Sequence, residues 1–358
     1  MRDLLFLVLV ATLLPAADRK TRHLVLMTAD GLRRQEIFSG IDPRLMREKA
    51  AHMDKEDDLR RQYWAETPAG RREKLFPFLW KILVPQGVIL GNMDRGSTVA
   101  VTNAYRVSYP GYSEILTCRA QDDRIRNNDP IQNPIPTVLE YIQQQWRLNR
   151  SQVALFGSWD RFRRIGESRP GSIFLNAGYQ DSDATPRIAE LSRAQHEALS
   201  PWGEVRHDYI TFEMALDYLR TFQPRVLYLS LGETDDWAHD KRYDRVLQTA
   251  HYFDRAIERL WQTLQSLPAY RDSTSLVLTA DHGRGSNLDD WDSHGNKIAG
   301  AEFIWIAALG PDTAPRGEIA NAGAIHQRDV AATLLSLAGL DWRAFCGDFG
   351  RPIPQIAP

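Results

Sequence analysis

Six short apolar runs, each bounded by glycine or polar residues, restrict the folds available to this chain more than any other feature. Hydrophobic residues are continuous in these runs and do not alternate with polar ones, which is typical of strands buried on both faces of a parallel sheet. The runs are His23–Gly31, Gly87–Met93, Ser151–Trp159, Arg225–Asp235, Thr274–Gly283 and Glu302–Gly310.

Stretches with the apolar spacing of amphipathic helices separate several of these runs. They are Ile135–Arg147, Thr211–Phe222, the segment from Val246 to Leu264, and Gln327–Leu340. Strands that alternate with helices predict an α/β fold, here an α/β/α sandwich with a mainly parallel central sheet.

The length of 358 residues allows one large domain or two small ones. We expect a single domain over residues 18–358, with a charged helical insertion at about residues 42–75 and a loop or small cap at about residues 167–203. The insertion carries charges of both signs, which favours a solvated helical segment over a phosphate-binding arm.

Residues 1–17 have the pattern of a secretory signal peptide. Arg2 precedes an apolar run over residues 4–14, and the small residues Ala16 and Ala17 follow, so cleavage is expected near Ala17. The run is short for a membrane span, although a short anchor or a buried N-terminal strand is an alternative. We therefore expect an exported protein, periplasmic or extracellular, with no stable membrane span after cleavage.

The two cysteines, Cys118 and Cys346, could form one disulfide in an exported protein and are too few for a cysteine-rich zinc site. A net charge of −2 argues against a general basic surface, so binding to a nucleic-acid duplex is not expected.

Acidic residues stand where three of the apolar runs end: Asp30, Asp235 and Asp281. In an open parallel sheet, the carboxyl ends of the strands form the edge at which ligands bind. One acid after a strand is commonly a turn or cap residue, but three at one edge indicate a binding site.

Three histidines lie close to these acids in the sequence. His239 follows Asp235 by four residues, His282 follows Asp281 directly, and His294 ends the loop "TADHGRGSNLDDWDSHG". Carboxylate oxygens with imidazole nitrogens suit zinc or a similar divalent ion, although any one of these histidines alone could be a surface or capping residue. The acids between the last two histidines are expected to be solvated loop residues: Asp289, Asp290 and Asp292.

The segment "VSYPGYSEILTC" is typical of the start of a helix, with Ser108 ahead of a proline in the first turn. A hydroxyl at a helix N-terminus suits a nucleophile that attacks an anionic ester, but this segment alone favours an ordinary N-cap. Three tryptophans near the proposed site segments could line a pocket, although core positions are the more common alternative: Trp159, Trp237 and Trp291.

Taken in order, these motifs resemble the alkaline-phosphatase superfamily, and most of all its type I phosphodiesterase/nucleotide pyrophosphatase branch, from His23 to about Leu340. The resemblance implies an alkaline-phosphatase-like fold with two divalent ions, zinc above all, with manganese as an alternative. One ion would be held by Asp235, His239 and His294. The other would be held by Asp30, Asp281, His282 and the hydroxyl of Ser108. An asparagine that contacts a substrate oxygen is implied about twenty residues after the nucleophile, where Asn127 and Asn128 stand.

The resemblance implies a hydrolase of small-molecule phosphate esters, diesters or monoesters, that acts through a covalent phosphoserine at Ser108. Thr234 and Ala238 stand where the branch usually has proline and glycine, the nucleophile is serine instead of threonine, and the interval before His294 is short. These departures leave the substrate open. A sulfatase or phosphonate hydrolase on the same scaffold, a phosphomutase, and a non-catalytic metal-binding protein are the alternatives. Cys118 lacks the Cys-x-Pro-x-Arg setting of a sulfatase.

Overall fold

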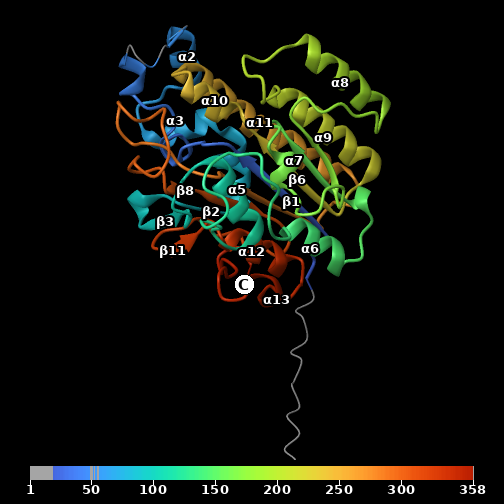
Figure 1. The fold of residues 1–358 in the computed structure, drawn as a ribbon. Helices are drawn as coiled ribbons and strands as arrows, with labels where there is room; N and C mark the ends of the chain where they lie inside the picture. Colours follow the sequence, from blue (N-terminus) through green and yellow to red (C-terminus); the bar gives the residue numbers. More distant parts are fainter. Residues whose placement is uncertain (1–18, 49–50, 52, 55, 358) are drawn as a thin grey trace, which may run out of the picture.

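A sheet of eight strands forms the centre of the computed structural model, which describes residues 19–48, 51, 53–54 and 56–357 (Figure 1). Its strands lie in the order β10-β2-β9-β7-β1-β6-β4-β5. Their bounds are β1 His23–Ala29, β2 Val88–Leu90, β4 Val153–Gly157, β5 Phe174–Ala177, β6 Val226–Leu231, β7 Thr274–Thr279, β9 Ile306–Leu309 and β10 Gly317–Glu318. Among these described strands only β9 runs opposite to the others, which confirms the predicted mainly parallel sheet. The predicted signal peptide lies outside the described residues.

The six apolar runs all contain strands, and those at the centre of the sheet are buried on both faces. Every residue of β1, β6 and β7 is buried, as continuous apolar runs predict. The last run divides at Trp305: β9 joins the main sheet, while β8 (Phe303–Ile304) joins a small sheet with β3 (Ser97–Ala100) and β11 (Gly323–His326).

Helices cover both faces of the sheet, with α5, α6 and α12 on one side and α9 and α11 on the other (Figure 1). The four predicted helices are present as α6 Val138–Gln145, α9 Asp208–Phe222, α11 Tyr243–Ser266 and α12 Asp329–Leu337. The remaining α-helices are α1 Arg34–Ser39, α2 Glu56–Tyr63, α3 Pro68–Leu75, α4 Val84–Gln86, α5 Ser108–Thr117, α7 Phe162–Ile165, α8 Pro186–Glu197, α10 Glu233–His239 and α13 Arg343–Cys346. Within the described part of the chain, no helix combines the length and apolar character that crossing a membrane requires.

The charged insertion and the loop or cap expected from the sequence both contain elements that pack against the rest of the fold. The charged segment at residues 42–75 contains α2 and α3, whose apolar residues Leu59, Tyr63 and Leu75 are buried. The segment at residues 167–203 was expected to be a loop or cap, but it contains the edge strand β5 and the helix α8, which packs on α9. Neither element was predicted, because β5 has only four residues and its turn-rich surroundings conceal it.

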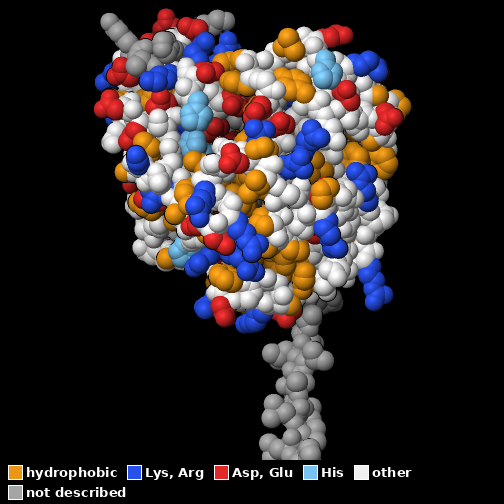
Figure 2. All heavy atoms as spheres, viewed as in Figure 1, with side chains coloured by type: hydrophobic (Ala, Val, Ile, Leu, Met, Phe, Trp, Pro, Cys, Tyr) orange, Lys and Arg blue, Asp and Glu red, His pale blue; other side chains and the backbone are white. Residues whose placement is uncertain are grey.

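The parallel register brings three strand ends to the same level. Thr28 of β1 lies opposite Ser230 of β6 and Thr279 of β7, so the residues that follow these strands emerge side by side. On the face shown in Figure 2, acidic side chains gather beside a histidine in the region where α10 lies in Figure 1.

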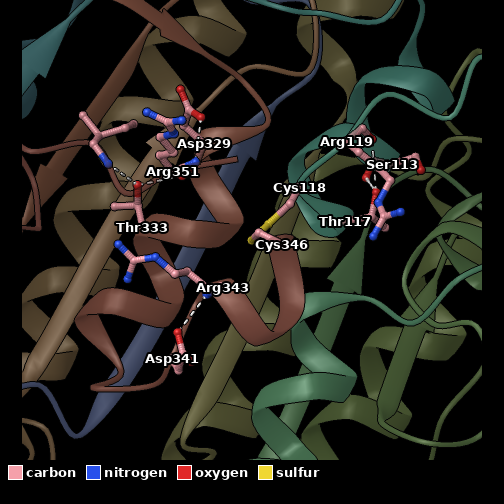
Figure 3. Close-up of a disulfide and its surroundings, with 11 residues drawn as sticks. Ser113, Thr117, Cys118, Arg119, Asp329, Thr333, Asp341, Arg343, Cys346 and Arg351 are labelled. Atoms are coloured by element: carbon pink, nitrogen blue, oxygen red, sulfur yellow. Dashed lines mark hydrogen bonds between the residues drawn. A yellow bond between two sulfur atoms is a disulfide. The ribbon is translucent and has the colours of Figure 1, made fainter. Parts of the chain in front are cut away.

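Cys118 and Cys346 form a disulfide, which the sequence had left open (Figure 3). Cys118 follows the last residue of α5, and Cys346 ends α13. The bond joins residues 228 positions apart and ties the C-terminal segment to the helix that begins at Ser108.

Removing this disulfide is expected to lower the free energy of unfolding by about 3–5 kcal/mol, because a cross-link that closes a long loop restricts the unfolded chain. The double variant Cys118→Ser/Cys346→Ser, compared with the wild type by urea denaturation, measures the loss. Wild-type protein with the bond reduced serves as the control and should match the variant. An unchanged urea midpoint would contradict the expectation.

Candidate metal centre

The three strand-end acids meet at one edge of the sheet, because β6, β1 and β7 are neighbours. Asp30 follows β1 directly, Asp235 lies in α10 just after β6, and Asp281 follows β7. Thr234 Oγ1 donates to the main-chain oxygen of Asp30 at 2.5 Å, which ties α10 to the end of β1. Threonine therefore has a structural role at one of the positions where the sequence departs from the branch it resembles.

Asp30, Asp281 and His282 form the first of two ligand groups, with one donor atom of each within 4.8 Å of the others. His282 Nε2 lies 3.4 Å from Asp30 Oδ1 and 3.4 Å from Asp281 Oδ2. The other carboxylate oxygens are held in place, since Tyr112 OH donates to Asp30 Oδ2 and the N–H of Gly31 donates to Asp281 Oδ1, each at 3.0 Å. Their conformations are thus set by the surrounding protein.

The two oxygens that face this group, Asp30 Oδ1 and Asp281 Oδ2, are buried without a hydrogen-bond partner among the described residues. Buried carboxylate oxygens are normally paired, and the ones that are not need an explanation such as an ion. The donor set fits a divalent cation on this observation.

Asp235, His282 and His294 form a second group of the same size. His239 adjoins it, with its Nε2 3.0 Å from His294 Nε2 and 3.1 Å from Asp235 Oδ2. The Nδ1 atoms of His282 and His294 donate to the main-chain oxygens of Gly283 and Arg106, at 3.0 and 3.1 Å. A carbonyl can only accept, so Nδ1 carries a proton in both rings, and in the neutral form of each ring Nε2 holds the lone pair that a metal requires.

The six aspartate and histidine residues predicted as ligands therefore come together, with one difference from the division that the resemblance implies. His282 was expected to serve only one ion, but its Nε2 lies 3.7 Å from Asp235 Oδ1 as well as beside Asp30 and Asp281. The rings of His282 and His294 stack with their centroids 3.9 Å apart. His282 therefore lies between the two groups.

Burial and neighbouring charges shift the pKa values of the histidines in this centre in opposite directions. Burial and the charge of His282 hold the pKa of His294 well below its usual value. Burial also acts to lower the pKa of His282, but the carboxylates of Asp281 and Asp30 outweigh it and raise that pKa to about 9. Burial and Asp30 raise the pKa of Asp281. Such a cluster takes up protons when no ion balances its negative charge, and it releases them to solvent when a cation binds.

Ser108 is buried as the first residue of α5, and its Oγ lies 3.3 Å from His282 Nε2. The N-cap position belongs to Val107, so the alternative that Ser108 is only a cap is wrong. Gly111 allows the helix to approach this closely, because a Cβ there would lie 2.2 Å from the main-chain oxygen of Asp281. The hydroxyl is therefore directed at the first ligand group and is not used to cap the helix.

Of the two candidate asparagines, the structure brings only Asn128 to Ser108. Asn128 lines the same cavity, and its Oδ1 accepts from the N–H of Tyr109 at 2.9 Å. Asn127 is exposed, and its Oδ1 accepts from the N–H of Asp129 at 3.0 Å. Of the two alternatives left open by the sequence, the structure therefore favours Asn128.

The cavity has a volume of about 270 Å³ and is lined partly by residues that sequence reasoning had not selected. Its lining is Asp30, Ser108, Asn128, Trp159, Arg161, Glu204, Val205, Gly232, Asp235, Asp236, His239 and His294. Arg161 donates to the main-chain oxygen of Asn128 at 3.2 Å and pairs with Asp160 and Glu204. Its position just after β4, beside β6, was the signal that could have found it.

Two other expectations about this region need correction. Asp292 is 7% exposed and lies 3.6 Å from Lys241, so it is not a solvated loop residue. Asp290 accepts from the N–H of Asn287 at 2.8 Å and shapes the loop, whereas Asp289 is exposed as expected. Among the three tryptophans, Trp159 lines the cavity, Trp237 packs edge-on against Trp202, and Trp291 is buried against Tyr243.

Residues 24–319 match the family model described as type I phosphodiesterase / nucleotide pyrophosphatase. Comparison with curated protein sequences finds no match.

Solved structures with a similar fold include the lipoteichoic acid synthase LtaP from Listeria monocytogenes, with a TM-score of 0.59, 13% identity, and coverage of 96% of this chain and 77% of that one. The phosphonate monoester hydrolase SpPMH from Silicibacter pomeroyi has a TM-score of 0.58 and 14% identity, and the match covers 94% of this chain and 78% of that one. The alkaline phosphatase PafA has a TM-score of 0.58 and 11% identity, and the match covers 95% of this chain and 99% of that one. At such low identity the likeness concerns the fold alone.

Proposed function

The chain belongs to the type I phosphodiesterase/nucleotide pyrophosphatase family, and on that premise we propose that it hydrolyses small-molecule phosphate esters with two divalent ions and Ser108 as the nucleophile. Its fold is alkaline-phosphatase-like, as the sequence predicts. The observation that carries the proposal is the buried Ser108 hydroxyl, which lies 3.3 Å from His282 Nε2 and lines one cavity with Asp30, whose Oδ1 has no hydrogen-bond partner among the described residues.

The ligand groups suggest how the ions would be shared. Asp30, Asp281, His282 and Ser108 Oγ would hold one ion, and Asp235, His239 and His294 would hold the other, with His282 Nε2 also close to Asp235 Oδ1 of the second group. Mixed carboxylate and imidazole donors favour zinc, with manganese as the alternative. Bound ions would supply positive charge that lowers the pKa of the serine hydroxyl and stabilises the attacking and leaving oxygens of an in-line displacement.

In the first step, Ser108 Oγ attacks phosphorus, the bond from phosphorus to the leaving-group oxygen breaks, and the serine proton passes to the leaving alcohol. A water molecule then attacks the phosphoserine, the bond between phosphorus and Oγ breaks, and serine and free phosphate (or, from a diester, the remaining monoester) are released. The side-chain amide of Asn128 and the N–H of Ser108 would donate to the non-bridging oxygens. Arg161 would hold Asn128 in position through its hydrogen bond to the Asn128 main-chain oxygen.

The disulfide bears on the alternatives and on the cellular compartment. Cys118 lies at the far end of α5 from Ser108 and is bonded to Cys346, which argues against Cys118 as a sulfatase nucleophile. A buried disulfide suits an oxidising compartment, so we place the protein in the periplasm or outside the cell.

Zinc content measured together with hydrolysis of four nitrophenyl esters tests the function. We expect two zinc ions per chain, faster hydrolysis of a phosphate monoester or diester than of the sulfate or phosphonate ester, loss of activity with a chelator, and recovery with zinc. None or one ion, or full activity without metal, would contradict the proposal. A preference for sulfate or phosphonate would replace it with that activity, and two ions without any hydrolysis would indicate a non-catalytic protein.

A further inference from the structure

Arg284, which directly follows the Asp281–Gly283 segment, is buried inside this centre. Its side chain is only 1% exposed, and its Nη2 donates to the Asp235 carboxylate and, at 3.0 Å, to the Asp235 main-chain oxygen. Its Nη1 donates to the main-chain oxygen of Asp292. Its Nε has no hydrogen-bond partner among the described residues. Thus a fully buried positive charge directly contacts one of the proposed metal ligands.

The oxygen that Arg284 contacts is the one that faces the second ligand group. Asp235 Oδ1 lies 3.7 Å from His282 Nε2 and 3.8 Å from His294 Nε2, whereas Oδ2 is directed at His239. A carboxylate oxygen has lone pairs for both a guanidinium N–H and a further cation. The arginine and an ion at Asp235 would therefore share the negative charge of one carboxylate.

Gly31 provides the space for this arrangement. Its φ of +55° lies in the left-handed region, and a Cβ there would lie 2.6 Å from Asp235 Oδ1 and 2.9 Å from Arg284 Nε. Because any side chain at this position would collide with both groups, the "ADG" at the end of β1 is part of the site of the guanidinium.

The carboxylates around Arg284 determine how its charge affects the protein with and without bound ions. Asp30, Asp235 and Asp281 are close together and largely removed from water, and uncompensated carboxylates in such a place destabilise a fold. Without ions, the Arg284 charge offsets part of this repulsion. With ions, the same fixed charge repels the divalent cation at Asp235.

We propose that Arg284 is an internal counter-ion of the metal centre, which stabilises the ion-free protein and makes the ion at Asp235, His239 and His294 the weaker of the two. The inference rests on the proposed two-ion function. Arg284 is thus a positioning residue that acts through Asp235. Its charge raises the folding stability of the ion-free protein and lowers the affinity of the second group for its ion.

Zinc binding and thermal unfolding of Arg284→Gln test the proposal. Competition with a chromophoric chelator should show that the weaker zinc ion binds about tenfold more tightly than in the wild type, because the repelling charge is gone. The Tm of the ion-free variant should fall more than that of the zinc-loaded variant, so that zinc raises the Tm by more than in the wild type. Arg284→Lys keeps the charge and should behave like the wild type in both measurements.

Arg33 provides a matched control, since it is also a fully buried arginine but pairs with Glu36 and the main chain of Gly285 instead of Asp235. Arg33→Gln should lower the Tm of the ion-free and zinc-loaded proteins by similar amounts and change the zinc affinity little. The same pattern in Arg284→Gln, or weaker zinc binding, would overturn the proposal.

A second variant, Arg284→Met, covers the case in which glutamine disturbs folding. Both variants should fold when expressed with zinc, and failure of both to do so would also overturn the inference. If the wild type itself does not bind two zinc ions, the proposed function fails. If it binds two and Arg284→Gln leaves the affinity unchanged, only the counter-ion role fails.

Discussion

Ser108→Ala is expected to reduce turnover of the best nitrophenyl phosphate ester by about a thousandfold or more, while two zinc ions stay bound. The hydroxyl is the only part of the side chain that would react, and it does not cap α5, so its removal leaves the helix and the aspartate and histidine ligands in place. Release of nitrophenolate measures the turnover, and mass spectrometry of acid-quenched wild-type enzyme should find a phosphate on Ser108.

Ser113→Ala is the matched control, because Ser113 is buried in the same helix but contacts Gln121 and Thr117 instead of the metal centre. Its turnover should stay close to that of the wild type. Substantial activity in Ser108→Ala, with zinc content unchanged, would exclude Ser108 as the nucleophile.

His282→Ala is expected to weaken both zinc ions and to lower turnover at least about a hundredfold, because its Nε2 faces Asp30, Asp281 and Asp235 together. Zinc titration of the ion-free variant measures both affinities. This expectation comes from the structure, since the family resemblance implied that His282 binds one ion alone.

His239→Ala is the comparison for this result. His239 is exposed, and among the ligand residues its side chain contacts Asp235 and His294 of the second group, so its removal should weaken one ion and leave the other unchanged. If His282→Ala also affected a single ion, the shared position of His282 would have no role in binding, and the division implied by the sequence would stand.

Local patterns made the central strands and their terminal acids predictable. A continuous apolar run indicates a strand buried on both faces, and the residue at which the run ends can be identified from that segment alone. Asp30, Asp235 and Asp281 could therefore be placed at one edge of the sheet. The four-residue spacing of Asp235 and His239 within a helix is equally local. The short strand β5 and the helix α8 escaped prediction because four residues in a turn-rich segment carry too little periodicity.

Contacts between segments that are distant in the sequence could not be predicted from such local patterns. Arg284 meets Asp235 across 49 positions, and Cys118 meets Cys346 across 228. The choice of Asn128 over Asn127 depends on which amide of two neighbours turns toward Tyr109. None of these has a signature in the residues next to it.

The sequence by itself determined the α/β class, the strand ends that carry the acids, and the acids and histidines proposed as metal ligands, because each stands out through a periodicity or a spacing within a few residues. Only the tertiary structure decided that His282 lies between the two groups and that Ser108 faces the first of them. It also decided that the buried Arg284 contacts Asp235, a proposed metal ligand. The reason is physical: hydrophobic periodicity is a property of one segment, whereas the charge balance of a buried site depends on which side chains several segments bring together.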